Sequence, residues 1–260
     1  MSDMPWTRVQ LRLQPPIATL RLDREAAGNA IDQALVDECT RALDACGDAI
    51  SVLVIEGGTE VFCAGADLQD HADHGDALAV DPATLYALWR RLAEGPFISI
   101  AHVRGRASAG GVGFAAACDI VLADASAAFS LPELLFGLHP ACVLPFLVRR
   151  VGFQRAHFLT LGTRPIGVGE AAAWGLVDAW EADSAALLRR HLQRMRRLPR
   201  DGIARYKAYA RGLHPALDAQ QERAVQANRA LFGDAGIRAS LGRFARSGLF
   251  PWEPDPPPPP

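Results

Sequence analysis

Two stretches rich in glycine and alanine are the features of this sequence best suited to chemistry. They are residues 61–68 (VFCAGADL) and 107–120 (ASAGGVGFAAACDI). In each, a strand-like pattern gives way to a helical one, and the small residues let a ligand approach backbone N–H groups where the helix begins. Two such points can polarise one carbonyl oxygen. The sequence therefore predicts an oxyanion hole, which suits chemistry on a thioester.

The elements that would position these stretches alternate between strands and helices, as in an α/β layer architecture. Helices are expected from Asp32, from Pro82 to Glu94 and from Gly110, and proline suits the first turn of a helix. Strands are expected at residues 8–13, 17–22, 51–55, 97–103, 120–123 and 127–130. After residue 132 helices are expected at 144–151, 154–161, 168–173, 184–198, 202–211 and 215–232. We find no internal repeat or interdomain linker, so one α/β domain with a helical C-terminal extension is predicted.

The overall composition excludes several classes of protein. The chain has 260 residues, of which 50% are hydrophobic and 22% charged, with a formal net charge of -2 and a pI of about 6.4. This balance does not favour binding to nucleic acid or to a membrane surface. The sequence has no apolar run of membrane-spanning length and no signal-like start, so a cytoplasmic location is expected.

The cysteines and histidines do not form a metal motif. The five cysteines include no CxxC pair, which predicts buried free thiols rather than a metal or redox site. His71 and His74 lie in a polar loop with three aspartates, and we expect that loop to be solvated rather than to hold a metal.

The order and spacing of these motifs closely resemble the crotonase superfamily, also known as the enoyl-CoA hydratase/isomerase fold. The resemblance rests on residues 28–31 (GNAI), 62–67 (FCAGAD), 109–111 (AGG), 118–120 (CDI), 129–133 (FSLPE), 167–171 (GVGEA) and 174–178 (WGLVD). It implies an α/β crotonase-like spiral of ββα units, assembled as a homotrimer or hexamer. It also implies a spiral core at residues 1–195 and a C-terminal helical trimerisation region at 196–250. The prolines near the end of the chain cannot form a helix or a sheet ladder, so a disordered proline-rich tail is expected at 251–260.

The resemblance places the two oxyanion donors on the backbone N–H groups of Ala66 and Gly110. Glu133 matches the carboxylate that exchanges the alpha proton in hydratases and isomerases. Its apolar neighbours could raise its pKa, which would let it act as acid and base near neutral pH. The alternative is a glutamate that only stabilises the start of a short helix.

The sequence departs from two-carboxylate hydratases at Gly113, where they carry a second glutamate. One carboxylate can still serve a syn dehydration, in which Glu133 takes the alpha proton and returns it to the leaving beta-hydroxyl. Asp67 is the other acid near the first oxyanion stretch. We expect it to cap the following turn, with a part in binding or proton transfer left open.

Residues 102–105, 109–114 and above all 133–150 (ELLFGLHPACVLPFLVRR) resemble the dehydratases of polyketide beta-branching cassettes. That resemblance implies dehydration of a 3-hydroxy-3-methylglutaryl group on an acyl carrier protein to the 3-methylglutaconyl thioester. The phosphopantetheine arm belongs to the substrate, and no metal, flavin or nicotinamide cofactor is expected. The rival functions are a CoA-dependent enoyl-CoA hydratase or isomerase and a catalytically silent binding protein of the same fold.

Two features of such a substrate call for positive charge on the enzyme. The distal carboxylate needs a cation or several donors, and the candidates are Arg104, Arg106, His139, Arg149, Arg150, His71 and His74. His139 is also a candidate acid or base. The acidic carrier protein needs a basic docking face, for which the candidates are Arg189, Arg190, Arg194 and Arg197 in the most basic part of the chain. A solvated helix face or a subunit contact would explain those arginines equally well.

Overall fold

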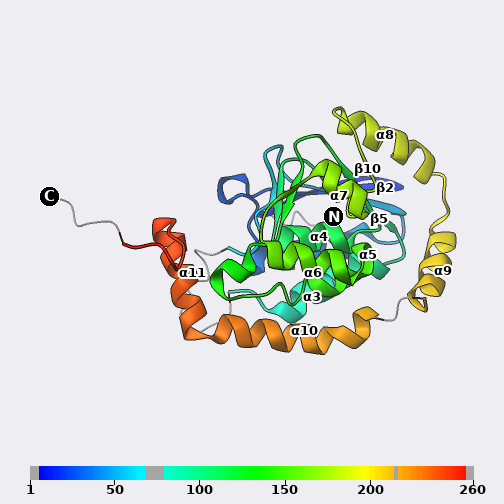
Figure 1. Cartoon of the computed structure of the whole chain (residues 1–260). Coiled ribbons are helices and arrows are strands. Elements are labelled where there is room, and N and C mark those ends of the chain that lie inside the picture. Colours follow the sequence, from blue (N-terminus) through cyan, green and yellow to red (C-terminus); the bar gives the residue numbers. More distant parts are fainter. Residues whose placement is uncertain (1–5, 68–78, 214–215, 256–260) are drawn as a thin grey trace.

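The computed structural model describes residues 6–67, 79–213 and 216–255, and its strands form two sheets (Figure 1). The six-stranded sheet has the order β1-β2-β3-β5-β7-β10, and its neighbours run parallel except for β1 and β2. The smaller sheet has the order β4-β6-β8-β9, in which β8 and β9 are antiparallel. The strands are β1 (Val9–Gln14), β2 (Ile17–Leu22), β3 (Val52–Glu56), β4 (Val61–Cys63), β5 (Ile98–Val103), β6 (Arg106–Ser108), β7 (Ile120–Ala123), β8 (Ala128–Ser130), β9 (Ile166–Gly167) and β10 (Ala179–Trp180).

Each turn of the chain adds one strand to each sheet. β3 is followed by β4, β5 by β6 and β7 by β8, and a helix leads on to the next turn after β4 and again after β6. This arrangement confirms the predicted spiral of ββα units. The helices are α1 (Gln33–Cys46), α3 (Pro82–Glu94), α4 (Gly110–Ala117), α5 (Leu144–Val151), α6 (Phe153–Gly162), α7 (Val168–Trp174), α8 (Ser184–Met195), α9 (Arg200–Arg211), α10 (Ala216–Gly233) and α11 (Ala235–Ser247), with 3-10 helices η1 (Glu25–Ala27) and η2 (Glu133–Phe136).

The central strand β3 of the six-stranded sheet is covered on both faces, and its first four residues are continuously apolar and buried. On β3, Leu53 and Ile55 pack into the main core, whereas Val52 and Val54 pack against Leu187 of α8. Helix α4 lies on the main-core side and is buried all round from Gly111 to Ala117. The sheet therefore separates α8 from the N-terminal end of α4.

The last four helices run around the outside of the core (Figure 1). Tyr86 of α3 donates its hydroxyl hydrogen to the Leu217 carbonyl at 2.8 Å, which fixes the start of α10. Helix α11 was not predicted, although Asp234 caps it by accepting from the Ile237 amide at 2.9 Å. Residues 251–255, expected to belong to the tail, lie against α11, where Arg243 contacts the Asp255 carboxylate at 3.0 Å; residues 256–260 lie outside the described part.

Lys207, the only lysine of the sequence, anchors α9 to the core. Its buried ammonium donates to the Asp119 carboxylate at 2.6 Å and to the Phe97 carbonyl at 2.9 Å. Burial lowers the pKa of Lys207, and Asp119 opposes that shift. Lys207 therefore does not belong to an exposed basic surface.

We expect Lys207→Met to lower the free energy of unfolding by about 3 kcal/mol, because it leaves the Asp119 carboxylate without its buried counter-charge. Chemical denaturation would measure the loss. Arg205→Met removes an exposed charge from the same helix and should change the free energy of unfolding by less than about 0.5 kcal/mol. Equal stability of the two variants would contradict the anchoring role.

No helix in the described part of the chain is long and apolar enough to cross a membrane. All five cysteines are free and buried, as predicted. Within residues 6–67, 79–213 and 216–255, no three potential metal-ligating side chains gather at one place. His71 and His74 lie outside the described residues.

Candidate active site

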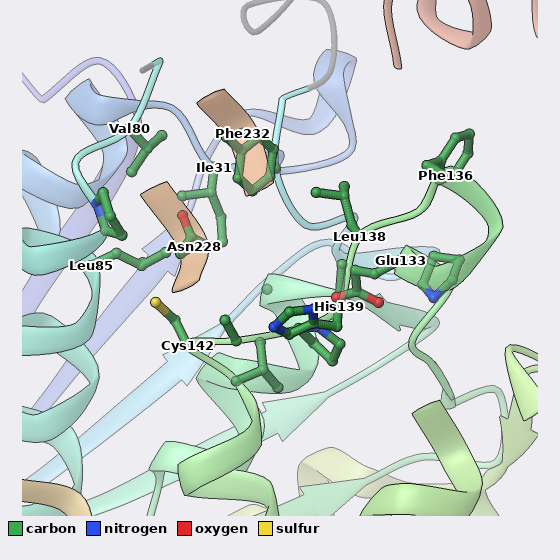
Figure 2. A pocket seen from close by; sticks show the side chains of 18 of the residues that line it. Ile31, Val80, Leu85, Glu133, Phe136, Leu138, His139, Cys142, Asn228 and Phe232 are labelled. Carbon is green, nitrogen blue, oxygen red and sulfur yellow. The ribbon is translucent and has the colours of Figure 1, made fainter. Parts of the chain in front are cut away.

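A cavity of about 150 Å³ lies at the N-terminal end of α4, between α3, η2 and α10 (Figure 2). Most of its lining is apolar, with Ile31 and Leu85 among the contributors. The side chains with polar atoms among its described lining residues are Trp89, Glu133, His139, Cys142 and Asn228. Ala66 and Gly110 line the same cavity. The two predicted oxyanion donors and the predicted proton-transfer residue therefore come together in one place.

The two oxyanion loops touch because they follow neighbouring parallel strands. Gly65 comes after β4 and Ala109 after β6, and the C-terminal ends of these strands lie at one edge of the small sheet. Gly65 has a φ of +95°, and an added Cβ there would lie 2.6 Å from the Ala109 Cβ and 3.3 Å from the Gly110 nitrogen. Only glycine fits this position, and its small size brings the two loops into contact.

Residues 29–31 hold the first loop in place. The Ile31 amide donates to the Gly65 carbonyl at 2.7 Å, and the Asp67 amide donates to the Ile31 carbonyl at 3.1 Å. Buried Asn29 donates its side-chain amide to the Phe62 carbonyl at 3.2 Å. These bonds use the backbone groups on either side of Ala66, whose own N–H has no acceptor among the described residues.

Gly110 presents its amide because it is the first residue of α4. The first N–H groups of a helix have no acceptor within the helix, and none is found for Gly110 among the described residues. Ala109 before it has a φ of +49°, a conformation that costs about 1 kcal/mol or more for a residue other than glycine. Its amide donates to the Ser130 carbonyl at 2.9 Å. The backbone at Ala109 is thus held in a strained shape directly before the second donor.

Glu133 is the first residue of η2, and its carboxyl group faces the cavity (Figure 2). Its Oε2 atom is buried and has no hydrogen-bond partner among the described residues. Burial raises the pKa of Glu133 to about 7. A carboxyl group with that pKa can both accept and donate a proton near neutral pH.

Comparison of the sequence with known proteins identifies the family of this chain. Residues 12–254 match the family described as Enoyl-CoA hydratase/isomerase. The chain belongs to this family. It is 44% identical over 257 residues to the bacillaene synthase dehydratase PksH of Bacillus subtilis (strain 168), covering 97% of this chain and 99% of that protein.

A crystal structure and a second curated protein are also similar to this chain. A crystal structure described as a polyketide biosynthesis enoyl-CoA hydratase (pksH) from Bacillus subtilis superposes with a TM-score of 0.92 at 44% identity, covering 95% of this chain and 100% of that one. The 2,3-dehydroadipyl-CoA hydratase of Escherichia coli (strain K12) is 37% identical over 174 residues, covering 65% of this chain and 68% of that protein.

The indole ring of Trp89 fills the space beside Gly113, the position that the sequence analysis compared with the second glutamate of two-carboxylate hydratases. A Cβ added at Gly113 would lie 2.4 Å from Cη2 of Trp89, which is itself buried. Trp89 is fixed by edge-to-face contacts with Phe114 and Phe146. A glutamate at position 113 would overlap the Trp89 ring, so Glu133 is the single carboxyl group among the described lining residues.

Asp67 is not among the described residues that line the cavity. Its carboxylate lies 2.7 Å from Nη1 of Arg24, which also donates to the Ala30 carbonyl at 3.1 Å. The ion pair ties the end of the first oxyanion loop to the segment before α1. This geometry favours a structural role for Asp67. The turn that Asp67 was expected to cap begins at residue 68, outside the described residues.

We expect Asp67→Asn to lower kcat by less than tenfold and the free energy of unfolding by about 1 kcal/mol, because the mutation weakens the partly buried pair with Arg24. Steady-state kinetics and denaturation would measure these effects. Asp44→Asn, which removes a more exposed pair with Arg91, is the matched control. A loss in kcat of a hundredfold or more in Asp67→Asn alone would instead indicate proton transfer.

The structure does not bring the predicted docking arginines to the cavity. Arg189 and Arg190 of α8 lie near Asp183 and Glu181, and Arg194 and Arg197 are exposed. Helix α8 packs on the face of the six-stranded sheet opposite to α4 (Figure 1). A docking role for these arginines remains a prediction that this placement does not favour.

Of the candidates for binding a distal carboxylate, only His139 is found in the described lining of the cavity. Arg149 and Arg150 line a separate cavity with Lys207, beyond the C-terminal end of α4. Arg104 lies near the Gly57 carbonyl, and Arg106 is an exposed residue of β6.

The sequence analysis missed the residues that close the cavity. Trp89 comes from α3, Cys142 from the segment before α5, and Asn228 and Phe232 from α10. No local motif marks these residues. The region 196–250 was expected to serve trimerisation. Asn228 and Phe232 of α10 and Leu241 of α11 show that this region also lines the cavity of its own chain.

Proposed function

We propose that this enzyme dehydrates a 3-hydroxy-3-methylglutaryl thioester on an acyl carrier protein to the 3-methylglutaconyl thioester. The observation that carries the proposal is the arrangement of one buried carboxyl group and two backbone amides around a single cavity. The 44% identity to a bacillaene synthase dehydratase supports the reaction and its direction.

The first step is removal of the alpha proton. The Glu133 carboxylate accepts that proton, and the electrons of the broken C–H bond move into the thioester to give an enolate. The Ala66 and Gly110 amides stabilise the enolate oxygen, and each fixed donor of this kind contributes about 3 kcal/mol. Neither amide titrates, so the oxyanion hole works over the whole pH range in which the fold is stable.

The second step is loss of the beta-hydroxyl group. The enolate electrons return to form the double bond between the alpha and beta carbons, and the bond from the beta carbon to oxygen breaks. Glu133, now protonated, donates its proton to the departing oxygen, so water leaves and the carboxylate is regenerated. One carboxyl group suffices because both transfers occur on the same face of the substrate.

The rival function, hydration or isomerisation of a CoA thioester, is supported less well. Hydration by a carboxylate pair needs a second acid, and the Trp89 ring takes up the space beside Gly113. We further propose a cytoplasmic enzyme that assembles as a homotrimer or hexamer, and that acts without a metal, flavin or nicotinamide. Each proposed step uses only the carboxyl group of Glu133 and two amides.

The test compares one acyl group on two carriers. The 3-hydroxy-3-methylglutaryl group is loaded onto an acyl carrier protein and onto CoA, and loss of water is followed by mass spectrometry. We expect kcat/KM to be at least tenfold higher with the carrier protein. Preference for CoA would favour the CoA-dependent rival, and absence of turnover with any thioester would favour the binding protein.

A further inference from the structure

The cavity holds very few groups that could receive a carboxylate. Besides Glu133, its described lining offers the His139 imidazole, the Asn228 amide, the Trp89 indole N–H and the Cys142 thiol. Histidine is the one basic side chain of this set. No arginine or lysine occurs in the described lining.

The chain fold brings His139 close to Glu133. Helix η2 ends at Gly137, which has a φ of +80°, and the Leu138 amide donates to the Glu133 carbonyl at 3.1 Å. This turn places residue 139 beside the start of η2, and both side chains enter the cavity (Figure 2). No hydrogen bond joins the two side chains in the described structure, which leaves the His139 ring available to a ligand.

Charge balance requires a cation at this place. A substrate with a distal carboxylate brings a negative charge into a mostly apolar cavity that already holds Glu133. Like charges at close range raise each other's pKa and oppose ionisation, yet Glu133 must be ionised to accept the alpha proton. A basic ring that can bind a proton beside the incoming carboxylate can offset this repulsion, which an amide or an indole cannot do.

Exposure also distinguishes His139 from the other donors. The Trp89 indole nitrogen is buried, whereas the His139 side chain is exposed. A carboxylate beside His139 keeps part of its hydration, whereas one beside Trp89 would lose it and gain only a neutral donor.

We propose that His139 binds the distal carboxylate of the substrate and thereby selects acyl groups that end in a carboxylate. This assignment rests on the proposed function, because it presupposes a glutaryl-type thioester. It gives His139 a binding role rather than a role in proton transfer.

The test uses two thioesters on the same carrier protein, the 3-hydroxy-3-methylglutaryl group and the same group with its distal carboxylate converted to a carboxamide. In His139→Gln we expect kcat/KM for the acid to fall 10- to 100-fold, the range of a charge-assisted hydrogen bond, mainly through KM. For the carboxamide, kcat/KM should change less than threefold in the same variant. His139→Lys, which restores a positive charge, should recover most of the preference for the acid.

His157→Gln makes the same chemical change at an exposed histidine of α6 and should leave both substrates unaffected. An equal loss for both substrates through kcat would overturn the proposal in favour of proton transfer by His139. The proposal would also be overturned if kcat/KM for the acid, but not for the carboxamide, fell in Asn228→Ala and not in His139→Gln. If the wild type dehydrates both thioesters equally well, carboxylate selection is wrong while the dehydratase function stands. If the wild type turns over neither thioester, both the dehydratase function and the carboxylate selection are wrong.

Discussion

Replacing Glu133 with glutamine is expected to lower kcat by about 10³-fold or more. A positioned general acid or base contributes about 10² to 10⁴ in rate, and Glu133 serves both proton transfers in the proposed reaction. Glutamine retains the size of the side chain but can neither accept nor donate the proton. Single-turnover measurement of water loss from the carrier-bound substrate would test the prediction.

The same residue sets the expected pH dependence. Burial raises the pKa of Glu133 to about 7, and the reaction begins with the ionised form. For the wild type, kcat/KM should therefore rise as the pH increases to about 7 and level off above it. The residual activity of Glu133→Gln should not show this step. Glu222→Gln, at an exposed position on α10, should retain both the wild-type rate and the wild-type profile.

As the pH rises from about 4.5 to about 7, the contribution of Glu133 to the free energy of unfolding should fall, whereas kcat/KM should rise. The folded protein binds the Glu133 proton more tightly than the unfolded chain does, because the pKa rises from 4.5 to about 7 on folding. The stabilisation by the protonated form is therefore complete below about pH 4.5 and is lost as the pH rises to about 7. At pH 8 we expect Glu133→Gln to be more stable than the wild type by about 3 kcal/mol, and at pH 4 nearly equal to it.

Activity of Glu133→Gln within tenfold of the wild type would refute Glu133 as the proton-transfer group. Equal stability of the two proteins at pH 8 would show that the buried carboxylate is better solvated than its surroundings indicate. The two measurements are independent, so the catalytic role and the electrostatic environment are tested separately.

Local signals predicted most of the elements that carry the site. The helix at Pro82–Glu94 could be predicted to the residue because Asp81 caps it and proline occupies its first position. Strand β7 was also predicted with its observed bounds, since its residues are continuously apolar. Strands β4 and β6 were indicated only as strand-like sequence without bounds, since three residues are too few to show a clear period.

The contacts that complete the site depend on packing between distant segments. Trp89 and Gly113 are 24 residues apart, and nothing in either local sequence indicates that one covers the other. Asn228 and Phe232 reach the cavity because α10 crosses α3 after the chain has passed around the whole core. The motifs and the family resemblance therefore indicated the candidate donors and the candidate acid, but not the walls that surround them.

Charge in the sequence was the least informative signal. The stretch from Arg189 to Arg211 is the most basic of the chain, yet within it Lys207 is buried against Asp119 and Arg200 contacts Asp48. Whether a basic side chain is available to a ligand depends on where its neighbours fold. For this reason the five candidates for the distal carboxylate that lie within the described residues could be ranked only after the cavity was known.

Replacing Gly65 with alanine is expected to lower kcat by 10²- to 10³-fold, the range observed when one oxyanion donor is lost. The added Cβ would lie 2.6 Å from the Ala109 Cβ and 3.0 Å from the Ser108 carbonyl oxygen, so the two loops would have to move apart. Because Ala66 and Gly110 adjoin these residues, their amides would no longer converge on one oxygen. The carboxyl group of Glu133 lies on a different element and should keep its elevated pKa.

Gly47→Ala separates this effect from the general cost of an alanine at positive φ. Gly47 caps the end of α1 with a φ of +54°, and no atom lies within 4 Å of an added Cβ there. We expect that variant to lose about 1 kcal/mol of stability and no activity. If Gly65→Ala and Gly47→Ala have the same kcat, contact between the loops does not set the distance between the two amides. If Gly65→Ala loses rate at every pH while keeping the pH profile of the wild type, the oxyanion hole and the proton shuttle contribute independently to catalysis.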